Sequence, residues 1–212
     1  MPIVISRRDA MTGIATTLSF AGMALGGSRS AFAAPQTGVA APQFTATDSR
    51  GEQHSLSGYR GKTVVLEWTN HECPYTVKHY ATGNMQALQQ AATGSGVVWL
   101  TVISSRPGSQ GHVEAVEADQ LTEKRSAKPT AVILDPKGDL GRLYGAQTTP
   151  HMYVINGEGN LVYMGGIDDQ PSASHATVKT ARNYVREALD AIAAGKPVPV
   201  PSARPYGCSV KY

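Results

Sequence analysis

Short apolar segments alternate along the chain with segments that have the periodicity of helices. Four apolar segments are rich in β-branched and aromatic residues, namely 63–69, 97–104, 130–135 and 151–155. Such runs are typical of strands in a sheet that is covered on both faces. The turn sequence Asn-Gly-Glu-Gly at 156–159 separates the last of them from a further apolar run at 161–164. This arrangement predicts an antiparallel return strand.

Two segments carry apolar residues at the three- and four-residue spacing of a helix. In the first, these residues are Val77, Ala81, Met85 and Leu88. We expect them on one buried face, with Lys78 and Asn84 turned away from it. In the second, they are Val178, Ala181, Val185, Ala188 and Ile192, before a stop at Gly195 and Pro197. Strands that alternate with helices predict an α/β sandwich.

The length and composition suit one domain with short appendages. The chain has 212 residues, of which 41% are hydrophobic and 17% are charged, so it can bury one good core. A turn at 49–51 between two short segments predicts a hairpin before the first long strand. We expect the domain at 42–195, after a featureless linker at 35–41. Residues 196–212 contain four prolines and are expected to form an extended tail.

Residues 1–34 have the features of an export signal. Arg7 and Arg8 precede a mildly apolar, uncharged stretch that reaches Ser28, and small residues at 31–34 offer a cleavage site. This pattern resembles a twin-arginine signal peptide and predicts export to the periplasm or beyond, where disulfides persist. The alternative is a membrane anchor, because the uncharged run is about the minimum spanning length of roughly 17 residues. Its many Gly, Thr and Ser residues favour a cleaved signal, with no stable membrane insertion afterwards.

The net charge of the chain is small. The formal charge of +3 falls to +1 without residues 1–34, because three arginines leave together with one aspartate. This balance argues against a nucleic acid or an anionic membrane as a partner.

Cys73 stands where an apolar strand pattern gives way to a helical one. The unpaired N–H groups at a helix start stabilise a thiolate, and Pro74 suits the first helical position because that N–H has no intrahelical partner. A cation among His71, Lys78 and His79 would add to this stabilisation. We therefore expect Cys73 to be a reactive nucleophile; the alternative is a buried, inert cysteine.

A second motif, Thr149-Pro150, enters a predicted strand. A proline there cannot donate to the ladder, so it must lie at the strand start, on an edge or in a bulge. It is a candidate cis-proline, which would expose the backbone of Thr149 beside a ligand. A trans proline that begins the strand is the alternative, and the spacing favours neither.

A set of motifs follows a fixed order over residues 42–195. They are Pro42, Phe44, Asp48, Gly51, Leu56, the run Tyr59-Arg60-Gly61-Lys62, a Trp-bearing strand before Cys73-Pro74, and Thr149-Pro150. Together they resemble the redoxin branch of the thioredoxin-like superfamily, which includes alkyl hydroperoxide reductase and thiol-specific antioxidant (AhpC/TSA) proteins. The sequences Cys-Pro-Tyr-Thr at 73–76 and Gly-Cys-Ser-Val-Lys-Tyr at 207–212 are similar to a subgroup of exported thioredoxin-family proteins.

The resemblance implies a fold and a set of site residues. The fold is a three-layer sandwich with a mixed central sheet, an N-terminal hairpin and a strand-helix insertion at 130–144. The implied nucleophile is Cys73, and the bond before Pro150 is expected to be cis. We expect substrate to contact four further positions, which are Pro74, Thr76, Thr149 and Pro150.

The chain departs from both main designs of this superfamily. Peroxiredoxins carry a hydroxyl residue three positions before the reactive cysteine, where this chain has Asn70, and no proline lies between Lys62 and Cys73. Thioredoxins carry a second cysteine in Cys-x-x-Cys, and Thr76 takes its place here.

Cys208 is the only other cysteine, so any disulfide within one chain joins it to Cys73. A resolving sulfur needs only to come within reach, and residues 196–208 span up to about 40 Å when extended. We expect Cys208 to resolve an intermediate formed on Cys73. A permanent staple of the tail and an inert thiol are the alternatives.

A metal site is a weaker alternative. His71, Cys73 and His79, with Cys208, are residue types that ligate Cu(I) or Zn²⁺. We nevertheless expect no metal and no other cofactor, because two histidines at one helix start would not converge on one ion. The remaining histidines, at 54, 112, 151 and 175, are expected on the surface or in loops. Asp168 and Asp169 are expected to cap a helix or face solvent.

The sequence therefore predicts an exported thiol-disulfide oxidoreductase that uses Cys73 and Cys208. Its partners would be a protein or small-molecule thiol or disulfide, and a protein that reduces it. The second hypothesis is a thiol peroxidase that uses the same cysteines on a peroxide. The third is a non-catalytic binding module or metal carrier.

Overall fold

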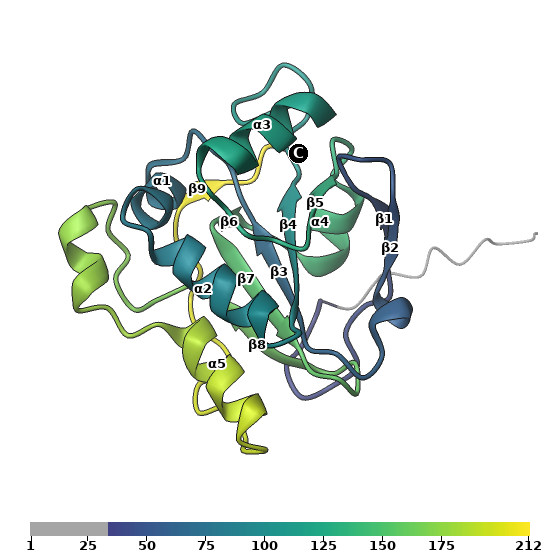
Figure 1. Cartoon of the computed structure of the whole chain (residues 1–212), viewed down its shortest axis with the longest axis vertical. Helices are drawn as coiled ribbons and strands as arrows, with labels where there is room; N and C mark the ends of the chain where they lie inside the picture. Colours follow the sequence, from purple (N-terminus) through teal and green to yellow (C-terminus); the bar gives the residue numbers. More distant parts are fainter. Residues whose placement is uncertain (1–33) are drawn as a thin grey trace, which may run out of the picture. The chain divides into compact units, whose positions relative to one another are not determined.

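The computed structural model describes residues 34–212, so the export signal predicted at 1–34 lies outside the described residues except for its last position. A central sheet has the strand order β5-β4-β3-β7-β8 (Figure 1). Its strands are β3 (Val64–Trp68), β4 (Val98–Ile103), β5 (Ala131–Leu134), β7 (His151–Ile155) and β8 (Leu161–Gly165). The first three run parallel, whereas β7 pairs antiparallel with both β3 and β8. The five predicted strands are confirmed.

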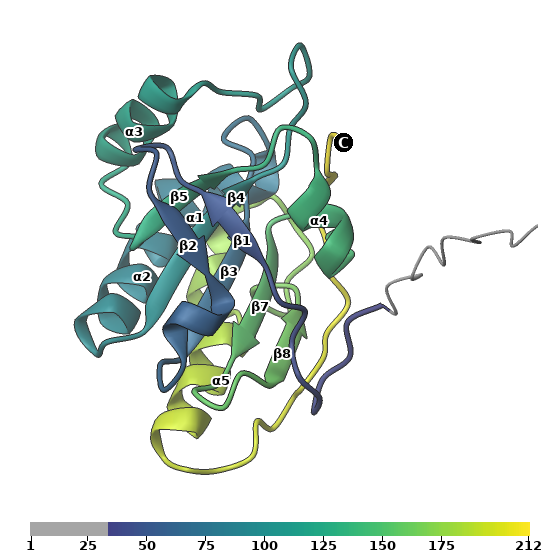
Figure 2. The ribbon, with the colours of Figure 1, turned by 90° about the vertical axis from the view of Figure 1, so that its right-hand side faces the viewer.

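Helices and a hairpin cover the two faces of this sheet (Figure 2). One face carries α1 (Pro74–Ala81), α2 (Asn84–Gly94) and α5 (Tyr184–Ala193). The other carries α4 (Asp139–Tyr144) and the hairpin of β1 (Thr45–Thr47) and β2 (Gln53–Ser55), which is followed by the 3-10 turn η1 (Leu56–Tyr59). Helix α3 (Ala115–Lys124) packs on β5. The predicted α/β sandwich and N-terminal hairpin are confirmed.

Alternation of side chains along the strands explains the two-sided core. Leu66 and Trp68 of β3 pack with Tyr144 of α4 on one face. Val65 points to the opposite face, where it packs in the cluster that contains Val185 of α5. Because successive residues of a strand face opposite sides, an unbroken apolar run fills both layers.

The first predicted helix is two helices. Helix α1 ends at Ala81, and Gly83, in the left-handed conformation with φ 74°, precedes the start of α2. Met85 and Leu88 are buried as expected, but Val77 is 39% exposed and Lys78 is fully buried. The predicted face was wrong for α1, because this helix turns its Lys78 side toward the segment after β8.

The last helix begins later than predicted. Asn183 caps α5 by accepting a hydrogen bond from the Arg186 N–H at 2.9 Å. Val178 lies before this cap, in the 3-10 turn η2 (His175–Lys179). The helix ends at Ala193, and Gly195 follows it with φ 64°, as the sequence predicts.

The segment that we expected to be a linker is hydrogen-bonded to the domain. The Gly38 N–H donates to the Leu161 carbonyl at 2.8 Å, and the Leu161 N–H donates to the Val39 carbonyl at 2.9 Å. Residues 38–41 therefore run beside the β7–β8 hairpin.

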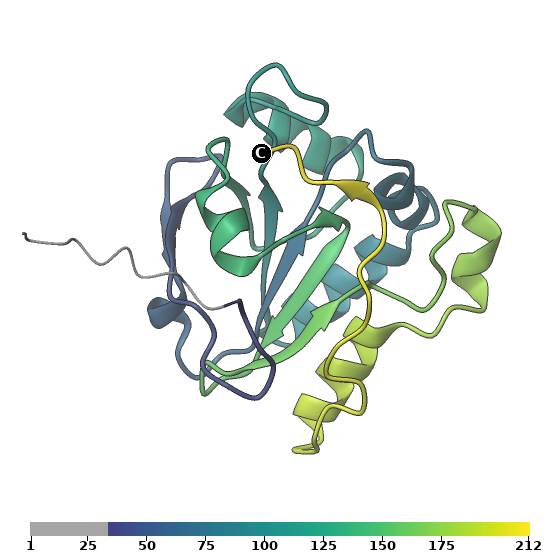
Figure 3. The same ribbon diagram turned by 180° about the vertical axis from the view of Figure 1, so that it is seen from behind.

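The C-terminal tail is extended, as predicted, but it is docked along its length (Figure 3). After α5 it follows β8, where the Ala203 N–H donates to the Met164 carbonyl at 3.1 Å. It then forms β9 (Cys208–Ser209), which pairs antiparallel with β6 (Thr148–Thr149). Beyond β9, the Tyr212 hydroxyl donates to the Ala146 carbonyl at 2.7 Å. Within residues 34–212, no helix is both long and apolar enough to cross a membrane.

Candidate active site around Cys73

Cys73 lies at the start of α1, as the sequence predicts. It occupies the N-cap position with φ −75° and ψ 121°, and Pro74 takes the first helical position. The Cys73 side chain is 0% exposed, and its sulfur lies 3.0 Å from the carbonyl oxygen of Thr149. The thiol is therefore at a helix N-terminus but closed off from bulk solvent.

The Thr149-Pro150 bond is cis, as the resemblance implies. The backbone of Thr149 faces two partners at once. Its carbonyl oxygen contacts the Cys73 sulfur, and its Cα lies opposite that of Cys208 in the β6–β9 register. The structure thus places the two predicted cysteines and the predicted cis-proline loop in one site.

Gly207 allows the tail to come this close. Its φ is 138°, and a Cβ at this position would lie 2.0 Å from the Thr149 carbonyl oxygen. Real Cβ atoms do not tolerate such a contact, so the approach of the tail backbone requires a glycine. Both cysteines are free thiols in this arrangement.

The surroundings of the two thiols favour ionisation of Cys73. Burial opposes its thiolate and is the largest single influence. Hydrogen bonds from the Cys208 thiol and the Thr149 side chain, and from the Cys208 and Thr76 backbones, outweigh burial and lower its pKa. While Cys73 is protonated, its thiol donates to the Thr149 carbonyl oxygen at 3.0 Å.

The Cys208 thiol behaves in the opposite way. Burial, and then its hydrogen bond to Cys73 and the negative charge there, raise the pKa of Cys208 to about 11. Of the two sulfurs, Cys73 is therefore the one that ionises first, and the Cys208 thiol stabilises its thiolate by a hydrogen bond.

The other predicted site residues differ in accessibility. Pro74 is exposed, whereas Thr76 and Pro150 are buried. Within residues 34–212, the Thr76 hydroxyl has no hydrogen-bond partner.

Asn70, at the position of the peroxiredoxin hydroxyl, accepts from the Glu72 N–H at 2.9 Å and donates to the Gln110 carbonyl at 3.3 Å. Its side chain is thus engaged in holding the loop before Cys73.

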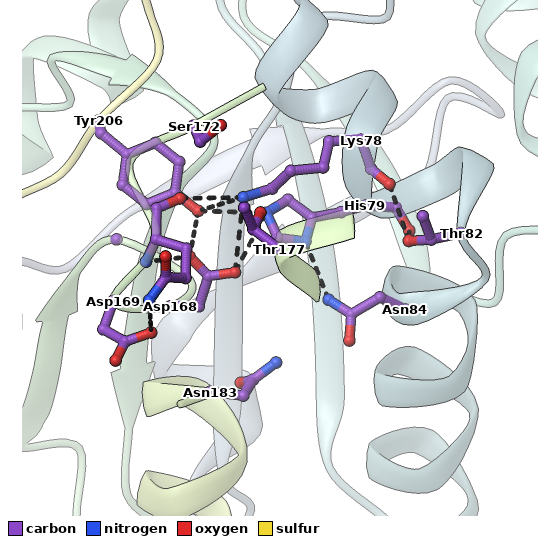
Figure 4. A network of polar contacts seen from close by, with 12 residues as sticks. Lys78, His79, Thr82, Asn84, Asp168, Asp169, Ser172, Thr177, Asn183 and Tyr206 are labelled. Atoms are coloured by element: carbon purple, nitrogen blue, oxygen red, sulfur yellow. Dashed lines mark hydrogen bonds and ion pairs between the residues drawn. The ribbon is translucent and has the colours of Figure 1, made fainter. Parts of the chain in front are cut away.

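A buried polar cluster holds the tail just before Cys208 (Figure 4). The Tyr206 hydroxyl donates to Asp168 and lies 3.3 Å from both the Lys78 Nζ and the His79 Nε2. The Asp168 carboxylate lies 3.6 Å from Lys78 and 3.8 Å from His79. We call these four residues the Tyr206 anchor. Asp168 is buried and accepts hydrogen bonds from Tyr206 and the Gln170 N–H, so the prediction that it caps a helix or faces solvent was wrong, whereas Asp169 is exposed.

The protonation states in the Tyr206 anchor follow from burial. Burial lowers the pKa of Lys78, and the neighbouring Asp168 partly restores it. Burial, together with the Lys78 charge, lowers the pKa of His79 to about 3, so this ring is neutral. Burial and Asp168 raise the pKa of Tyr206, so the phenol keeps its proton and donates it. Sequence reasoning missed this cluster; the acid pair at 168–169 and a tyrosine two residues before Cys208 were its only signals.

The histidine–cysteine set considered for a metal does not form a cluster. The ring of His79 contacts Tyr206 through one nitrogen and Asn84, at 2.9 Å, through the other. Among the described residues, the one group of His, Cys, Asp and Glu with metal-ligand spacing is Asp48, Glu52 and His54. There the Asp48 carboxylate accepts the Glu52 N–H at 2.8 Å and lies 3.0 Å from the His54 ring. These contacts account for that group as part of the hairpin turn.

Two histidine predictions were wrong. His151 lies in β7 and is 5% exposed, and its Nδ1 accepts a hydrogen bond from the Gln147 N–H at 3.2 Å. His54 is largely buried against Asp48 and Tyr59. Both rings have polar partners that a surface or loop residue would not need.

The chain matches a known protein family over more than half of its length. The model of the AhpC/TSA family matches residues 37–164. The chain belongs to the AhpC/TSA family. Cys73 and Pro150 fall within the matched segment of this family member, whereas Asp168, Tyr206 and Cys208 lie beyond it.

Relatives of this AhpC/TSA protein include a thiol-disulfide oxidoreductase. The chain is 28% identical over 117 residues to ResA of Geobacillus kaustophilus, a thiol-disulfide oxidoreductase. The aligned segment covers 50% of this chain and 67% of ResA. The solved structure of a hypothetical protein, SMc02350 of Sinorhizobium meliloti, has 19% identity and a TM-score of 0.71, and covers 85% of this chain and 96% of that one. A chain proposed to be the thiol:disulfide interchange protein DsbE of Chlorobium tepidum has 22% identity and a TM-score of 0.50. The match covers 62% of this chain and 85% of that one.

The family match and these relatives confirm the predicted fold and the predicted class of enzyme. The AhpC/TSA protein has the thioredoxin-like fold of the redoxin branch. It is an oxidoreductase of the class that acts on thiols, disulfides or peroxides.

Proposed function

We propose that the protein is an exported thiol-disulfide oxidoreductase in which Cys73 is the nucleophile and Cys208 the resolving cysteine. The observation that carries this proposal is the pairing of Cys208 with Thr149, whose carbonyl oxygen lies 3.0 Å from the Cys73 sulfur. A tail thiol is thereby held at the helix N-terminus where the nucleophile ionises. The relative ResA is named as a thiol-disulfide oxidoreductase.

The first step is attack of the Cys73 thiolate on a substrate disulfide. One sulfur of the substrate becomes bonded to Cys73, and the other leaves as a thiolate that takes a proton from water. The lowered pKa of Cys73 supplies the attacking thiolate, whereas the raised pKa of Cys208 keeps that residue from competing.

The second step is attack of Cys208 on the Cys73 sulfur of the mixed disulfide. Once Cys73 is bonded to substrate, its negative charge no longer raises the pKa of Cys208, and the nearby Lys211 still lowers it. Cys208 can then lose its proton and displace the second substrate thiolate. The substrate disulfide gains two electrons, and the chain loses two as the Cys73–Cys208 disulfide forms.

Reduction of an insulin-type disulfide by the reduced mature chain tests this assignment. We expect Cys73→Ser to abolish the activity. We expect Cys208→Ser to accumulate a Cys73–substrate disulfide that mass spectrometry detects and dithiothreitol reverses. Activity that survives Cys73→Ser, or a Cys208→Ser variant that turns over like the unmodified chain, would reject it.

Export rests on the sequence of residues 1–34. A reporter fused after residue 41 should leave the bacterial cytoplasm, and replacement of Arg7 and Arg8 by Lys should retain it there. A fusion that stays in the cytoplasm with both arginines intact would reject export.

A thiol peroxidase is the second candidate, and the closure of the site favours it. A peroxide is small enough to approach a sulfur that is 0% exposed, and the product, a sulfenic acid, would condense with Cys208 and release water. Mixing reduced chain with excess hydrogen peroxide decides between the two. Oxidation of Cys73 orders of magnitude faster than that of a free low-molecular-weight thiol would make the protein a peroxidase. A rate equal to that of the free thiol would remove this candidate.

A further inference from the structure

The Tyr206 anchor is a buried polar site that the chemistry at Cys73 does not itself require. Lys78 and His79 are 0% exposed and Asp168 is 3% exposed, although all three carry titratable groups. Buried groups of this kind are costly unless they are paired. The Tyr206 hydroxyl contacts each of them, so one phenol from the tail completes the cluster.

The cluster joins the tail to the helix that begins at the nucleophile. Lys78 and His79 lie on α1, which starts directly after Cys73, and Asp168 follows β8. The Tyr206 ring also contacts α1, because it packs edge-on against Tyr75 at 5.8 Å and lies 5.1 Å from the Lys78 Nζ. A fixed point on the tail is thus tied to the same rigid element that carries Cys73.

The position of Tyr206 in the sequence determines what this tie does. Cys208 is the second residue after Tyr206, and two extended residues span at most about 7 Å. Before Tyr206, the nearest backbone hydrogen bond from the tail to the sheet is that of Ala203, five residues ahead of Cys208. The anchor therefore moves the last fixed point before the β6–β9 pair from five residues to two residues ahead of Cys208.

We propose that Tyr206, bound by Lys78, His79 and Asp168, is the positioning residue that holds Cys208 against Cys73 and sets how readily their disulfide forms. This inference rests on the proposed function. Effective concentration falls with about the −3/2 power of the free length, so lengthening the segment from two residues to five lowers it about fourfold. The same change removes one of the contacts that hold the tail over Cys73, and the β6–β9 pair remains.

The reaction that reports this positioning is oxidation of the chain by oxidised glutathione. The Cys73 thiolate forms a mixed disulfide with one glutathione and releases the other; Cys208 then displaces the bound glutathione. One glutathione disulfide is reduced to two thiols, and one Cys73–Cys208 disulfide is formed. The fraction of protein disulfide in buffers of known glutathione ratio gives the effective concentration of the two cysteines.

The test compares Tyr206→Phe with the unmodified full chain in these buffers. We expect Tyr206→Phe to lower the effective concentration about fourfold and Tyr206→Ala to lower it at least as much. In the reduced chain, we expect the same variants to raise the rate at which iodoacetamide alkylates Cys73. A lower effective concentration together with faster alkylation indicates that Cys208 is no longer held against Cys73. A loss of thiol reactivity would instead lower both the effective concentration and the alkylation rate.

Tyr59→Phe is a matched control. Its phenol contacts His54, which pairs with Asp48 at 3.0 Å, so it also belongs to a Tyr-His-Asp cluster, but on the hairpin. We expect this variant to keep the effective concentration of the unmodified chain. Equal values for Tyr206→Phe and the unmodified chain would overturn the positioning role alone. Absence of a Cys73–Cys208 disulfide in the unmodified chain at every glutathione ratio would instead overturn the proposed function.

Discussion

Thr149 and Cys208 face each other across the antiparallel pair β6–β9, although 59 residues separate them in the sequence. This pairing makes the tail a second strand on the cis-proline loop. It also covers Cys73, whose sulfur contacts the same Thr149. A protein substrate must therefore displace β9 before it reaches the nucleophile, whereas a small molecule has less to move. In the reaction that we propose, the position of the tail would therefore govern both access to Cys73 and the second step.

Replacing Gly207 should lift the tail from the site. In Gly207→Ala the new Cβ would lie 2.0 Å from the Thr149 carbonyl oxygen, at a φ of 138° that disfavours a side chain. Overpacking of this kind costs about 1–3 kcal/mol. We expect alkylation of Cys73 to accelerate at least about fivefold, as measured by mass spectrometry of the reduced chain.

Gly195→Ala is the control for this variant. Gly195 also has a positive φ, 64°, but a Cβ there would meet no atom of residues 34–212 within 4 Å. It should leave the alkylation of Cys73 unchanged. Equal rates for Gly207→Ala and the unmodified chain would contradict the docking of β9 in solution.

The two thiols should titrate in separate steps. Hydrogen bonds lower the pKa of Cys73 against the effect of burial, and the pKa of Cys208 is raised to about 11. The ultraviolet absorbance of thiolate should therefore rise first below the range of a free cysteine and again near pH 11. In Cys208→Ala the first step should move to higher pH, because the largest stabilising hydrogen bond is removed. A first step at the same pH in both chains would contradict this account of the Cys73 thiolate.

Thr76→Cys should restore the local partner that the Cys-x-x-Cys motif provides. Thr76 is fully buried, its hydroxyl has no hydrogen-bond partner in the described part of the chain, and its backbone hydrogen-bonds the Cys73 sulfur. A thiol suits this site better than a hydroxyl, since a buried unpaired hydroxyl is unfavourable. After mild oxidation, peptide mapping should find Cys73 bonded to position 76, with Cys208 free. A Cys73–Cys208 disulfide as the main product would show that the tail outcompetes the local partner.

The free energy of unfolding should decrease as the pH is lowered, because His151 is buried in its neutral form. Burial lowers the pKa of His151 to about 4, from an ordinary value of 6.5. Below pH 6.5 the unfolded chain binds a proton that the folded chain does not bind until about pH 4. The stability is thus complete above the unfolded value and is lost as the pH falls through this window, by about 2 kcal/mol at pH 5.

Urea unfolding of His151→Gln at neutral and acidic pH measures this contribution. The variant lacks the titrating ring, so the difference in unfolding free energy between it and the unmodified chain should shrink by about 2 kcal/mol from pH 7 to pH 5. A difference that is the same at both pH values would show that His151 is not held neutral.

Local sequence patterns predicted the frame of the site. The strand runs, the position of Cys73 before a helix and the suitability of Pro74 for its first turn depend only on neighbouring residues. The sequence also restricted any disulfide within one chain to Cys73 and Cys208, because it contains no third cysteine. These conclusions follow from periodicity and counting, and they need no knowledge of distant contacts.

The orientation of α1 required the tertiary structure. Spacing of apolar residues placed Val77 inside and Lys78 outside, and the structure reverses them. Lys78 is buried because Asp168 and Tyr206, which lie 90 and 128 residues later, supply the charge and the hydroxyl that make its burial tolerable. A periodic pattern cannot register polar partners that come from other segments.

What the sequence by itself determined is which atoms can react: one cysteine at a helix start, and one on a tail long enough to reach it. What only the tertiary structure decided is that the tail is docked on Thr149, with Gly207 allowing the approach and Tyr206 anchoring it. The physical reason is that reach depends on chain length alone. Docking depends instead on the shape and charge of a surface built from residues far apart in the sequence.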